Sequence, residues 1–246
     1  MSAPFGYVVN DKYVNISVDT DTAFETDGDT NEAIITVEYS DAPAVGELTV
    51  EKKGEVLDGF KGGLLASSYE KEFVYKEGSL AGAKFEVYAA EDIYTADNQK
   101  DADGNRIKYY SKGDLVATLT TDGLGTVYHK AGDKVATIVT NDKGIARIDD
   151  LPLGKYYLVE TKTLDGFVLD DTPIDADLSY IDQNTKVVFA GMDVTNERQK
   201  VQITVTKTDS ETKNALEGAV FGLFAKENIV NKDGKVIVKC GAETSD

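Results

Sequence analysis

The stretch Glu47-Leu-Thr-Val-Glu-Lys52 alternates apolar and polar side chains, which is typical of a β-strand that buries one face. Residues two apart in a strand share a face, so Leu48, Val50 and Lys52 point the same way. The stretch recurs as Gln202-Ile-Thr-Val-Thr-Lys207, which places the two lysines 155 residues apart (207 − 52). A recurrence of this kind indicates an internal repeat.

Other matching segments set the boundaries of the repeat. Asp41 and Asn196 keep the same 155-residue offset (196 − 41), and residues 80–93 match residues 216–229. We therefore expect three parts along the chain. They are the C-terminal part of a preceding repeat (1–45), one complete repeat (46–197), and the N-terminal part of a following repeat (200–246).

The two ends of the chain are predicted to be incomplete repeats. Gly6 and Gly166 lie in matching segments with an offset of 160 (166 − 6), so the counterpart of Glu160 would fall immediately before Met1. Each partial repeat leaves strand edges and half of an apolar face in water, which is costly. We expect residues 1–45 and 200–246 to pair with each other, within one chain or between neighbouring chains.

Short runs rich in Val, Ile, Thr and Tyr recur throughout the sequence, separated by Gly, Asp and Asn turns. No long segment has a 3.6-residue apolar period, so the predicted fold class is all-β, a sandwich. The predicted strands include 33–39, 48–52, 84–88, 115–120, 135–139, 156–159, 186–189 and 201–205.

Composition excludes several classes of function. The net charge is −18, so phosphate repulsion excludes nucleic acid as a partner. Cys240 is the single cysteine, so no intrachain disulfide can form and rigidity needs another source. No run of 18 apolar residues predicts a membrane span. The start, Met1-Ser-Ala-Pro4, lacks signal-peptide features, so we expect a signal peptide and an anchor outside this stretch.

The sequence predicts neither a nucleophile triad nor a metal site. His129 is the single histidine, and no serine or cysteine nucleophile motif surrounds it. The acidic stretches Asp19 to Asp29 and Asp97 to Asn105 lack the spacing of an EF-hand, so we interpret them as turns. We expect no cofactor and no metal.

Two further segments place polar residues on apolar faces. Leu158 shares a face with Glu160, and Val194 shares one with Asn196. Burial disfavours charge, which lowers the pKa of Lys52 and favours a protonated Glu160. A neutral amine is a nucleophile, and we expect the Glu160 acid to polarise the Asn196 carbonyl.

The ordered set of motifs resembles the Cna protein B-type domains, the SpaA-like or prealbumin-like domains of Gram-positive pilins and surface adhesins. The resemblance implies an Ig-like or prealbumin-like sandwich in which Lys52 and Asn196 form an isopeptide bond assisted by Glu160. It also makes Asp41 an acceptor and Lys207 a donor in the neighbouring incomplete repeats. The matching segments are Thr49-Val-Glu-Lys52, Leu80-Ala-Gly-Ala-Lys-Phe85, Thr140-Asn-Asp-Lys-Gly144, Leu151-Pro-Leu-Gly-Lys-Tyr156, Glu160-Thr-Lys162, Asp165-Gly-Phe167 and Val194-Thr-Asn196-Glu.

Each of these residues also has an ordinary reading. Lys52 could extend to the surface at a strand end, Glu160 could pair with Lys162, and Asn196 could sit in a turn. The resemblance favours the bond, and with it a structural stalk repeat of an extracellular, cell-wall-anchored pilus or adhesin. Its partners would be neighbouring repeats, and its single-turnover crosslink would not make it an enzyme.

The alternative function is a surface module that binds a carbohydrate or a host protein. Such a module needs a flat aromatic platform, and the sequence has no Trp. Its tandem aromatic pairs are Tyr109-Tyr110 and Tyr156-Tyr157, and in a strand one member of each pair must face inward.

Overall fold

The computed structural model describes residues 2–18, 25–26, 33–61, 72–96, 98–120, 137–139 and 142–245. Within these ranges the chain is all-β, which confirms the predicted fold class. The same ranges contain no helix that could cross a bilayer.

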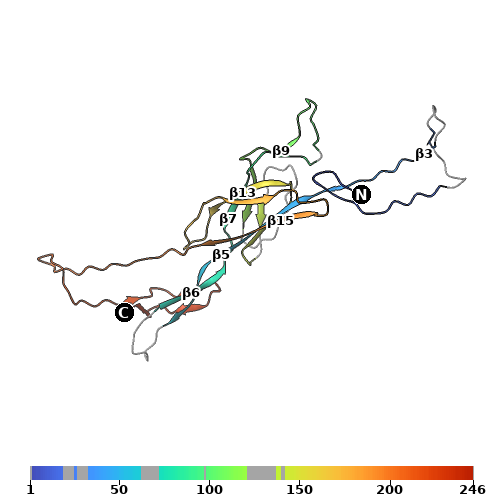
Figure 1. The fold of residues 1–246 in the computed structure, drawn as a ribbon. Helices are drawn as coiled ribbons and strands as arrows, with labels where there is room; N and C mark the ends of the chain where they lie inside the picture. The colour runs from blue at the N-terminus through green and yellow to red at the C-terminus, as the bar shows by residue number, and fades with distance from the viewer. Residues whose placement is uncertain are drawn as a thin grey trace.

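Two facing sheets form a central sandwich (Figure 1). In the described part of the chain, the first sheet has the strand order β11 (Thr137–Val139), β10 (Leu115–Thr120), β7 (Lys84–Ala89), β13 (Gly154–Lys162), β14 (Ile174–Leu178). The second sheet has the order β12 (Ile145–Leu151), β5 (Val45–Lys61), β15 (Val187–Asn196), and β6 (Glu72–Ser79) pairs with β5 beyond the sandwich.

The core lies between the two sheets because their strands alternate apolar and polar side chains. On β5 every second residue from Gly46 to Val56 is buried, including Leu48, Val50 and Lys52. Strand β13 does the same with Tyr156, Leu158 and Glu160. The facing strands contribute further buried side chains, among them Phe85, Val87, Ala146, Ile148, Leu178 and Val188.

Strands β5 and β15 are parallel neighbours, although they are the first and last strands of the sandwich. In their register Lys52 lies opposite Val194, and Asn196 lies opposite Gly54. Lys52 and Asn196 therefore occupy adjacent inward positions at the same end of the strand pair. Sequence-distant residues meet here only because the sandwich closes.

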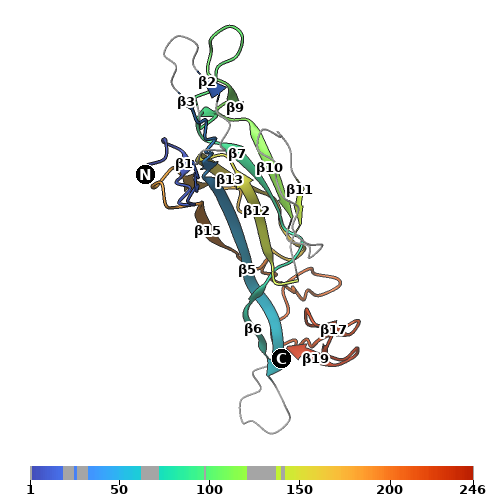
Figure 2. The same ribbon diagram turned by 90° about the vertical axis from the view of Figure 1, so that its right-hand side faces the viewer.

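The chain is elongated, and its terminal segments lie at opposite ends of the sandwich in both Figure 1 and Figure 2. The N-terminal segment (residues 2–44) has two strand pairs among its described residues: β1 (Tyr7–Val8) with β4 (Ala42–Pro43), and β2 (Glu25–Thr26) with β3 (Ala33–Ile34). The described C-terminal segment (residues 197–245) also has two: β16 (Leu223–Phe224) with β19 (Glu243–Ser245), and β17 (Ile229–Val230) with β18 (Val236–Val238).

The expected pairing of the two ends within one chain is therefore wrong. Each described terminal segment pairs its strands with itself, and the length of the sandwich separates the two (Figure 1). Pairing between neighbouring chains, and the boundaries of the repeats, stay predictions.

Two predicted strands form only partly or not at all, and both belong to the terminal segments. Of residues 33–39, only Ala33 and Ile34 are in a strand, and residues 201–205 are extended without strand partners. Alternation alone does not make a strand, because the backbone groups also need a neighbouring strand to pair with.

Two other predictions fall wholly or partly outside the described residues. His129 and most of Asp19 to Asp29 lie outside the described ranges. The described part of the second acidic stretch is a turn, as predicted, in which the Asp101 carboxylate accepts hydrogen bonds from the N–H groups of Asp103 and Asn105.

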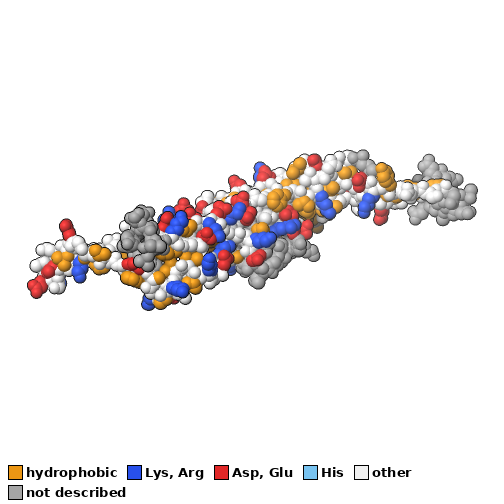
Figure 3. Space-filling view, turned by 90° about the horizontal axis from the view of Figure 1, so that it is seen from below, with side chains coloured by type: hydrophobic (Ala, Val, Ile, Leu, Met, Phe, Trp, Pro, Cys, Tyr) orange, Lys and Arg blue, Asp and Glu red, His pale blue; other side chains and the backbone are white. Residues whose placement is uncertain are grey.

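On the face drawn in Figure 3, acidic and basic side chains lie interspersed along the central part of the molecule. Hydrophobic side chains lie between them on the same face (Figure 3). A further pair of small strands, β8 (Ile93–Tyr94) and β9 (Lys108–Tyr110), forms a hairpin at the end of the sandwich near the N-terminal segment.

Candidate functional site

Lys52 is fully buried, although a lysine side chain rarely loses all contact with water. Strand β5 holds it on the inner face because Leu48 and Val50 precede it on that face and bury completely. Its amine lies 5.7 Å from the centre of the Phe85 ring on the facing sheet. The inward direction predicted by the alternation is therefore confirmed.

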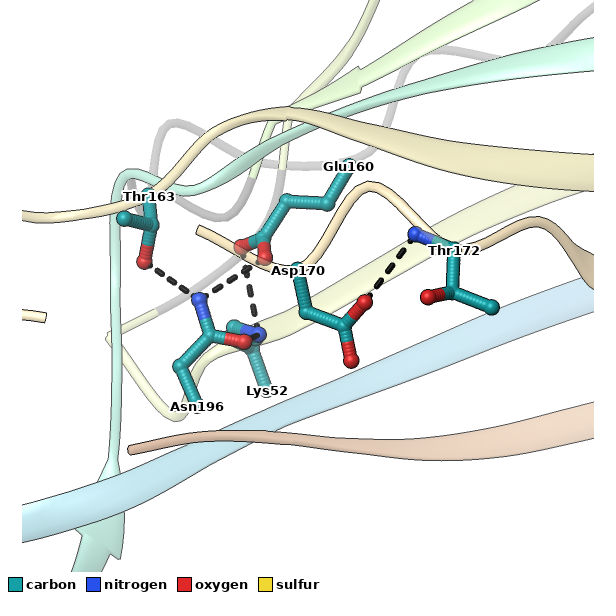
Figure 4. Close-up of polar contacts among 6 residues, drawn as sticks. All are labelled: Lys52, Glu160, Thr163, Asp170, Thr172 and Asn196. Atoms are coloured by element: carbon teal, nitrogen blue, oxygen red, sulfur yellow. Dashed lines mark hydrogen bonds and ion pairs between the residues drawn. The ribbon is translucent and has the colours of Figure 1, made fainter. Parts of the chain in front are cut away.

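The Lys52 amine meets the other two predicted residues in one buried cluster (Figure 4). It donates a hydrogen bond to Asn196 Oδ1 at 2.5 Å and lies 3.1 Å from Glu160 Oε1. Asn196 and Glu160 are each 1% exposed. Strands β5, β13 and β15 thus deliver an amine, a carboxyl group and a carboxamide to one point.

The two oxygens of Glu160 face two different nitrogens. Oε1 has no hydrogen bond of ordinary geometry and contacts the Lys52 amine as an ion pair. Oε2 accepts a hydrogen bond of 2.7 Å from Asn196 Nδ2. The sequence led us to expect Glu160 at the carbonyl oxygen of Asn196, but it contacts the amide nitrogen, the atom that leaves as ammonia if the amide is exchanged.

Thr163 is the fourth residue of the cluster, and it was not predicted from the sequence. Its Oγ1 accepts a hydrogen bond of 2.6 Å from Asn196 Nδ2 (Figure 4). Counting in twos from Glu160 would point Thr163 outward. The pairing of β13 with β7 shifts register between Glu160 and Lys162, and the strand ends there, so the count no longer holds.

The end of the site is closed by side chains that occupy the space over Gly54. A Cβ added to Gly54 would lie 2.6 Å from Phe167 and 2.8 Å from Leu80. Any larger residue there would have to displace these two side chains. Gly54 thus lets apolar groups cover the site and exclude water from it.

Burial is the main cause that lowers the pKa of the Lys52 amine from its ordinary value. The Glu160 carboxylate opposes this shift through its charge and its 3.1 Å contact with the amine, and the charge of Asp170 opposes it more weakly. The net direction favours the neutral, nucleophilic amine.

The two other predicted crosslink residues are not brought together. Lys207 is exposed in the C-terminal segment. Asp41 is half-buried in the N-terminal segment, where its carboxylate accepts a hydrogen bond from the N–H of Asn10 at 2.9 Å. The two terminal segments to which these residues belong lie at opposite ends of the sandwich (Figure 1).

Each tandem tyrosine pair places one ring in the core. Tyr110 and Tyr156 are buried, so one member of each pair does face inward as predicted. The outward Tyr157 stacks on Tyr88 with ring centres 5.1 Å apart. The rings of Tyr157 and Tyr88 therefore cover each other. Among the described residues, no group of His, Cys, Asp or Glu side chains is arranged to hold a metal ion.

Comparison with known proteins identifies one family and several related folds. Residues 70–192 match the family of SpaA prealbumin-like fold domains, a stretch that contains Glu160 and ends before Asn196. No curated protein matches the sequence.

Solved structures similar to this chain include two pilins and one further protein. They are the minor pilin GBS52 of Streptococcus agalactiae (17% identity, TM-score 0.34, 67% of this chain and 49% of that one), the TIE protein of Bacillus anthracis (17%, 0.39, 80% and 24%) and the major pilin SpaA of Corynebacterium diphtheriae (16%, 0.32, 63% and 31%). The chain spans half or less of the length of each of these proteins.

Proposed function

Because the chain belongs to the family of SpaA prealbumin-like fold domains, we propose that it is a structural stalk repeat of a cell-surface pilus or adhesin. Its central sandwich is closed by an amide bond between Lys52 and Asn196. The buried contact of Lys52, Glu160 and Asn196 is the observation that carries this proposal.

The bond forms by exchange of one nitrogen for another at the Asn196 side chain. The Lys52 ammonium first gives a proton to the Glu160 carboxylate, which leaves a neutral amine beside a protonated Glu160. The amine lone pair attacks Cγ of Asn196, Glu160 gives its proton to Nδ2 and takes one from the attacking nitrogen, the Cγ–Nδ2 bond breaks, and ammonia leaves. The products are one secondary amide, one ammonia and a protonated Glu160, which releases the surplus proton to return to the carboxylate.

No outside catalyst is needed, since the fold holds the reacting groups in contact. Oriented intramolecular groups react as if at very high concentration, which lowers the barrier to amide exchange by about 7–11 kcal/mol. The reaction occurs once per chain, so the domain is not a turnover enzyme.

The position of the bond fits a domain that carries tension. A pull on the chain enters at the start of β5 and leaves at the end of β15, and the proposed bond joins Lys52 near the first point to Asn196 at the second. Force then passes through about eight residues of β5 and the crosslink. The strands between residues 53 and 195 carry none of it and stay folded.

Such a stalk acts outside the cell, on the cell wall, with neighbouring repeats of the same polypeptide as its partners. A covalent tie also supplies the rigidity that a chain with a single cysteine cannot obtain from a disulfide.

Intact-mass measurement tests the bond, and force spectroscopy tests the function. The purified protein should weigh one ammonia less than its calculated mass, and the Lys52→Ala variant should show its full mass. When pulled from both ends, the parent sandwich should not lengthen, while the variant should unfold and extend. Full mass in the parent, or equal extension of both proteins, would reject the proposal.

A further inference from the structure

The central repeat and the C-terminal segment can be aligned by their backbone hydrogen bonds. The N–H of Leu80 donates to the carbonyl of Lys52 at 2.9 Å, and the N–H of Leu216 donates to the carbonyl of Lys207 at 2.8 Å. The same local contact thus follows each of the two lysines. This hydrogen bond marks equivalent positions in the two repeats, so the number of residues between donor and acceptor can be compared.

The central repeat carries many more residues between these points. Residues 53–79 lie between the partners in the central repeat, but only residues 208–215 do so in the C-terminal segment. A short turn is therefore enough to connect the two residues that form this hydrogen bond. The extra residues form a two-stranded ribbon (residues 53–61 of β5 with 72–79 of β6), which projects beyond the sandwich in Figure 2.

The ribbon contacts the linker that leaves the sandwich. Arg198 follows Asn196 by two residues, and its guanidinium lies 3.7 Å from the centre of the Tyr75 ring on β6. Its Nε also lies 3.7 Å from a carboxylate oxygen of Glu55 on β5. Both strands of the ribbon therefore hold the linker through one arginine.

The ribbon also contacts the C-terminal segment. Strand β18 packs against β5, and both views show the segment beside the ribbon (Figures 1 and 2). Val56 and Val238 are buried although neither belongs to the sandwich core. The pKa of Lys76 is raised chiefly by its 2.6 Å contact with Asp58 and further by Asp233 of the C-terminal segment.

A second extension lies at the other end of the sandwich. Ile93 pairs with Tyr110 in the β8–β9 hairpin, and Ile229 pairs with Val238 in the β17–β18 hairpin. Sixteen residues separate the first pair and eight separate the second. The central hairpin is again the longer of the two.

This longer hairpin contacts the N-terminal segment. Ala96 lies so close to Gly6 that a Cβ added to the glycine would be 2.8 Å from the Ala96 Cβ. A cavity of about 540 Å³ remains beside this contact, lined by Phe5 from one side and by Tyr94 and Tyr109 from the other. The β8–β9 hairpin therefore packs less tightly against the N-terminal segment than the ribbon packs against the C-terminal segment.

We propose that the β5–β6 ribbon and the β8–β9 hairpin are splints that hold the neighbouring repeats at fixed angles to the central sandwich. At the equivalent points of the described C-terminal segment the ribbon is absent and the hairpin is shorter, and each extension touches a different neighbour. A two-stranded ribbon is only marginally stable alone, so its contacts with a neighbour also stabilise the ribbon itself. This proposal assumes that the terminal segments are neighbouring repeats of the proposed stalk. It does not require the covalent bond.

Distance measurement between two spin labels tests the ribbon. One label is placed on the exposed native Cys240 and the other on Asp175→Cys, an exposed site on β14 far from the ribbon. In the test protein Asn-Gly replaces residues 56–76, because Glu55 pairs with Glu77 and a two-residue turn joins such partners. Gly54 and the reactive site stay unchanged.

The parent should show one narrow distance distribution, and the shortened protein should show one at least about twofold broader, as expected when a flexible linker replaces a fixed joint. Equal widths, or a broad distribution in the parent, would overturn the proposal. The double variant Tyr75→Ala/Arg198→Ala keeps the ribbon and should also broaden the distribution. Intact mass measured on each sample reports the crosslink separately, so failure of the stalk chemistry is distinguishable from failure of the splint.

The hairpin is tested in the same way with Cys240→Ser, Asp175→Cys and Asp11→Cys. Asn-Gly replaces residues 95–107, because Tyr94 pairs with Lys108. The distribution should broaden, but less than with the shortened ribbon, because the contact is looser. An unchanged width would remove the hairpin from the proposal.

Discussion

Lys52 and Lys207 end nearly the same six-residue sequence but stand in opposite surroundings. Both carbonyls accept the same local hydrogen bond, from Leu80 and from Leu216. Lys52 is fully buried on a strand paired on both sides, while Lys207 is exposed on a segment with no strand partner among the described residues.

The difference shows that burial of the amine comes from distant parts of the repeat. Strands β12 and β15 flank β5, and β13 covers it with Glu160. The described C-terminal segment has no counterparts of these strands. A lysine in this motif is therefore a surface amine where no sandwich surrounds it, and the proposed bond requires the surroundings of Lys52.

The largest predicted effect is on thermal stability, which should fall when the Lys52 site is changed but not when the Lys207 site is changed. Lys52→Ala or Asn196→Ala removes a crosslink between residues 144 apart, which by analogy with disulfide loops costs about 5 kcal/mol of unfolding free energy. We expect a fall in Tm of roughly 10–20 °C, measured by calorimetry. The matched variants Lys207→Ala and Asp41→Ala should leave Tm unchanged. Similar losses in all four proteins would show that burial does not distinguish the sites.

Glu160→Gln should keep the fold but slow the chemistry. The amide cannot accept the Lys52 proton, and loss of such a proton relay slows reactions about 10²- to 10⁴-fold. The rate is followed by intact mass at successive times after cell-free synthesis. Glu197→Gln, an exposed neighbour of Asn196, is the control and should react at the parent rate. Ammonia loss from Glu160→Gln at that same rate would remove Glu160 from the mechanism.

Thr163→Val should have a smaller effect on the same rate. It removes one hydrogen bond of about 1 kcal/mol that orients the Asn196 amide, so the reaction should slow roughly five- to tenfold. Thr161→Val, which changes an exposed residue of the same strand, should not slow it. If both variants react like the parent, Thr163 has no positioning role.

The pH dependence of stability should show the smallest effect. In Asn196→Ala the Lys52 amine stays free, and its folded pKa lies below its unfolded value of 10.5. Between these two values the unfolded chain binds more protons, so the free energy of unfolding rises with pH in this window. Lys52→Met/Asn196→Ala lacks the titrating group and should show a flatter curve in urea titrations. Parallel curves would contradict the lowered pKa.

The sequence predicted the central sandwich and the inward direction of Lys52, Glu160 and Asn196, because these follow from period-two alternation. Lys52, Glu160 and Asn196 all lie on the faces that the count assigns to them. Thr163 could not be predicted, because a register shift changes the count at its position. The failure of 201–205 to form a strand has the same kind of cause, since strand formation depends on partners that a local pattern does not contain.

Peptide mapping by tandem mass spectrometry tests the contrast between the two lysines most directly. After digestion of the parent protein, we predict one branched peptide that joins Lys52 to Asn196 and has lost one ammonia. Lys207 and Asp41 should appear only in linear peptides, with no loss of water. Linear peptides that contain unmodified Lys52 and Asn196, or a branched peptide that joins Lys207 to Asp41, would contradict the account.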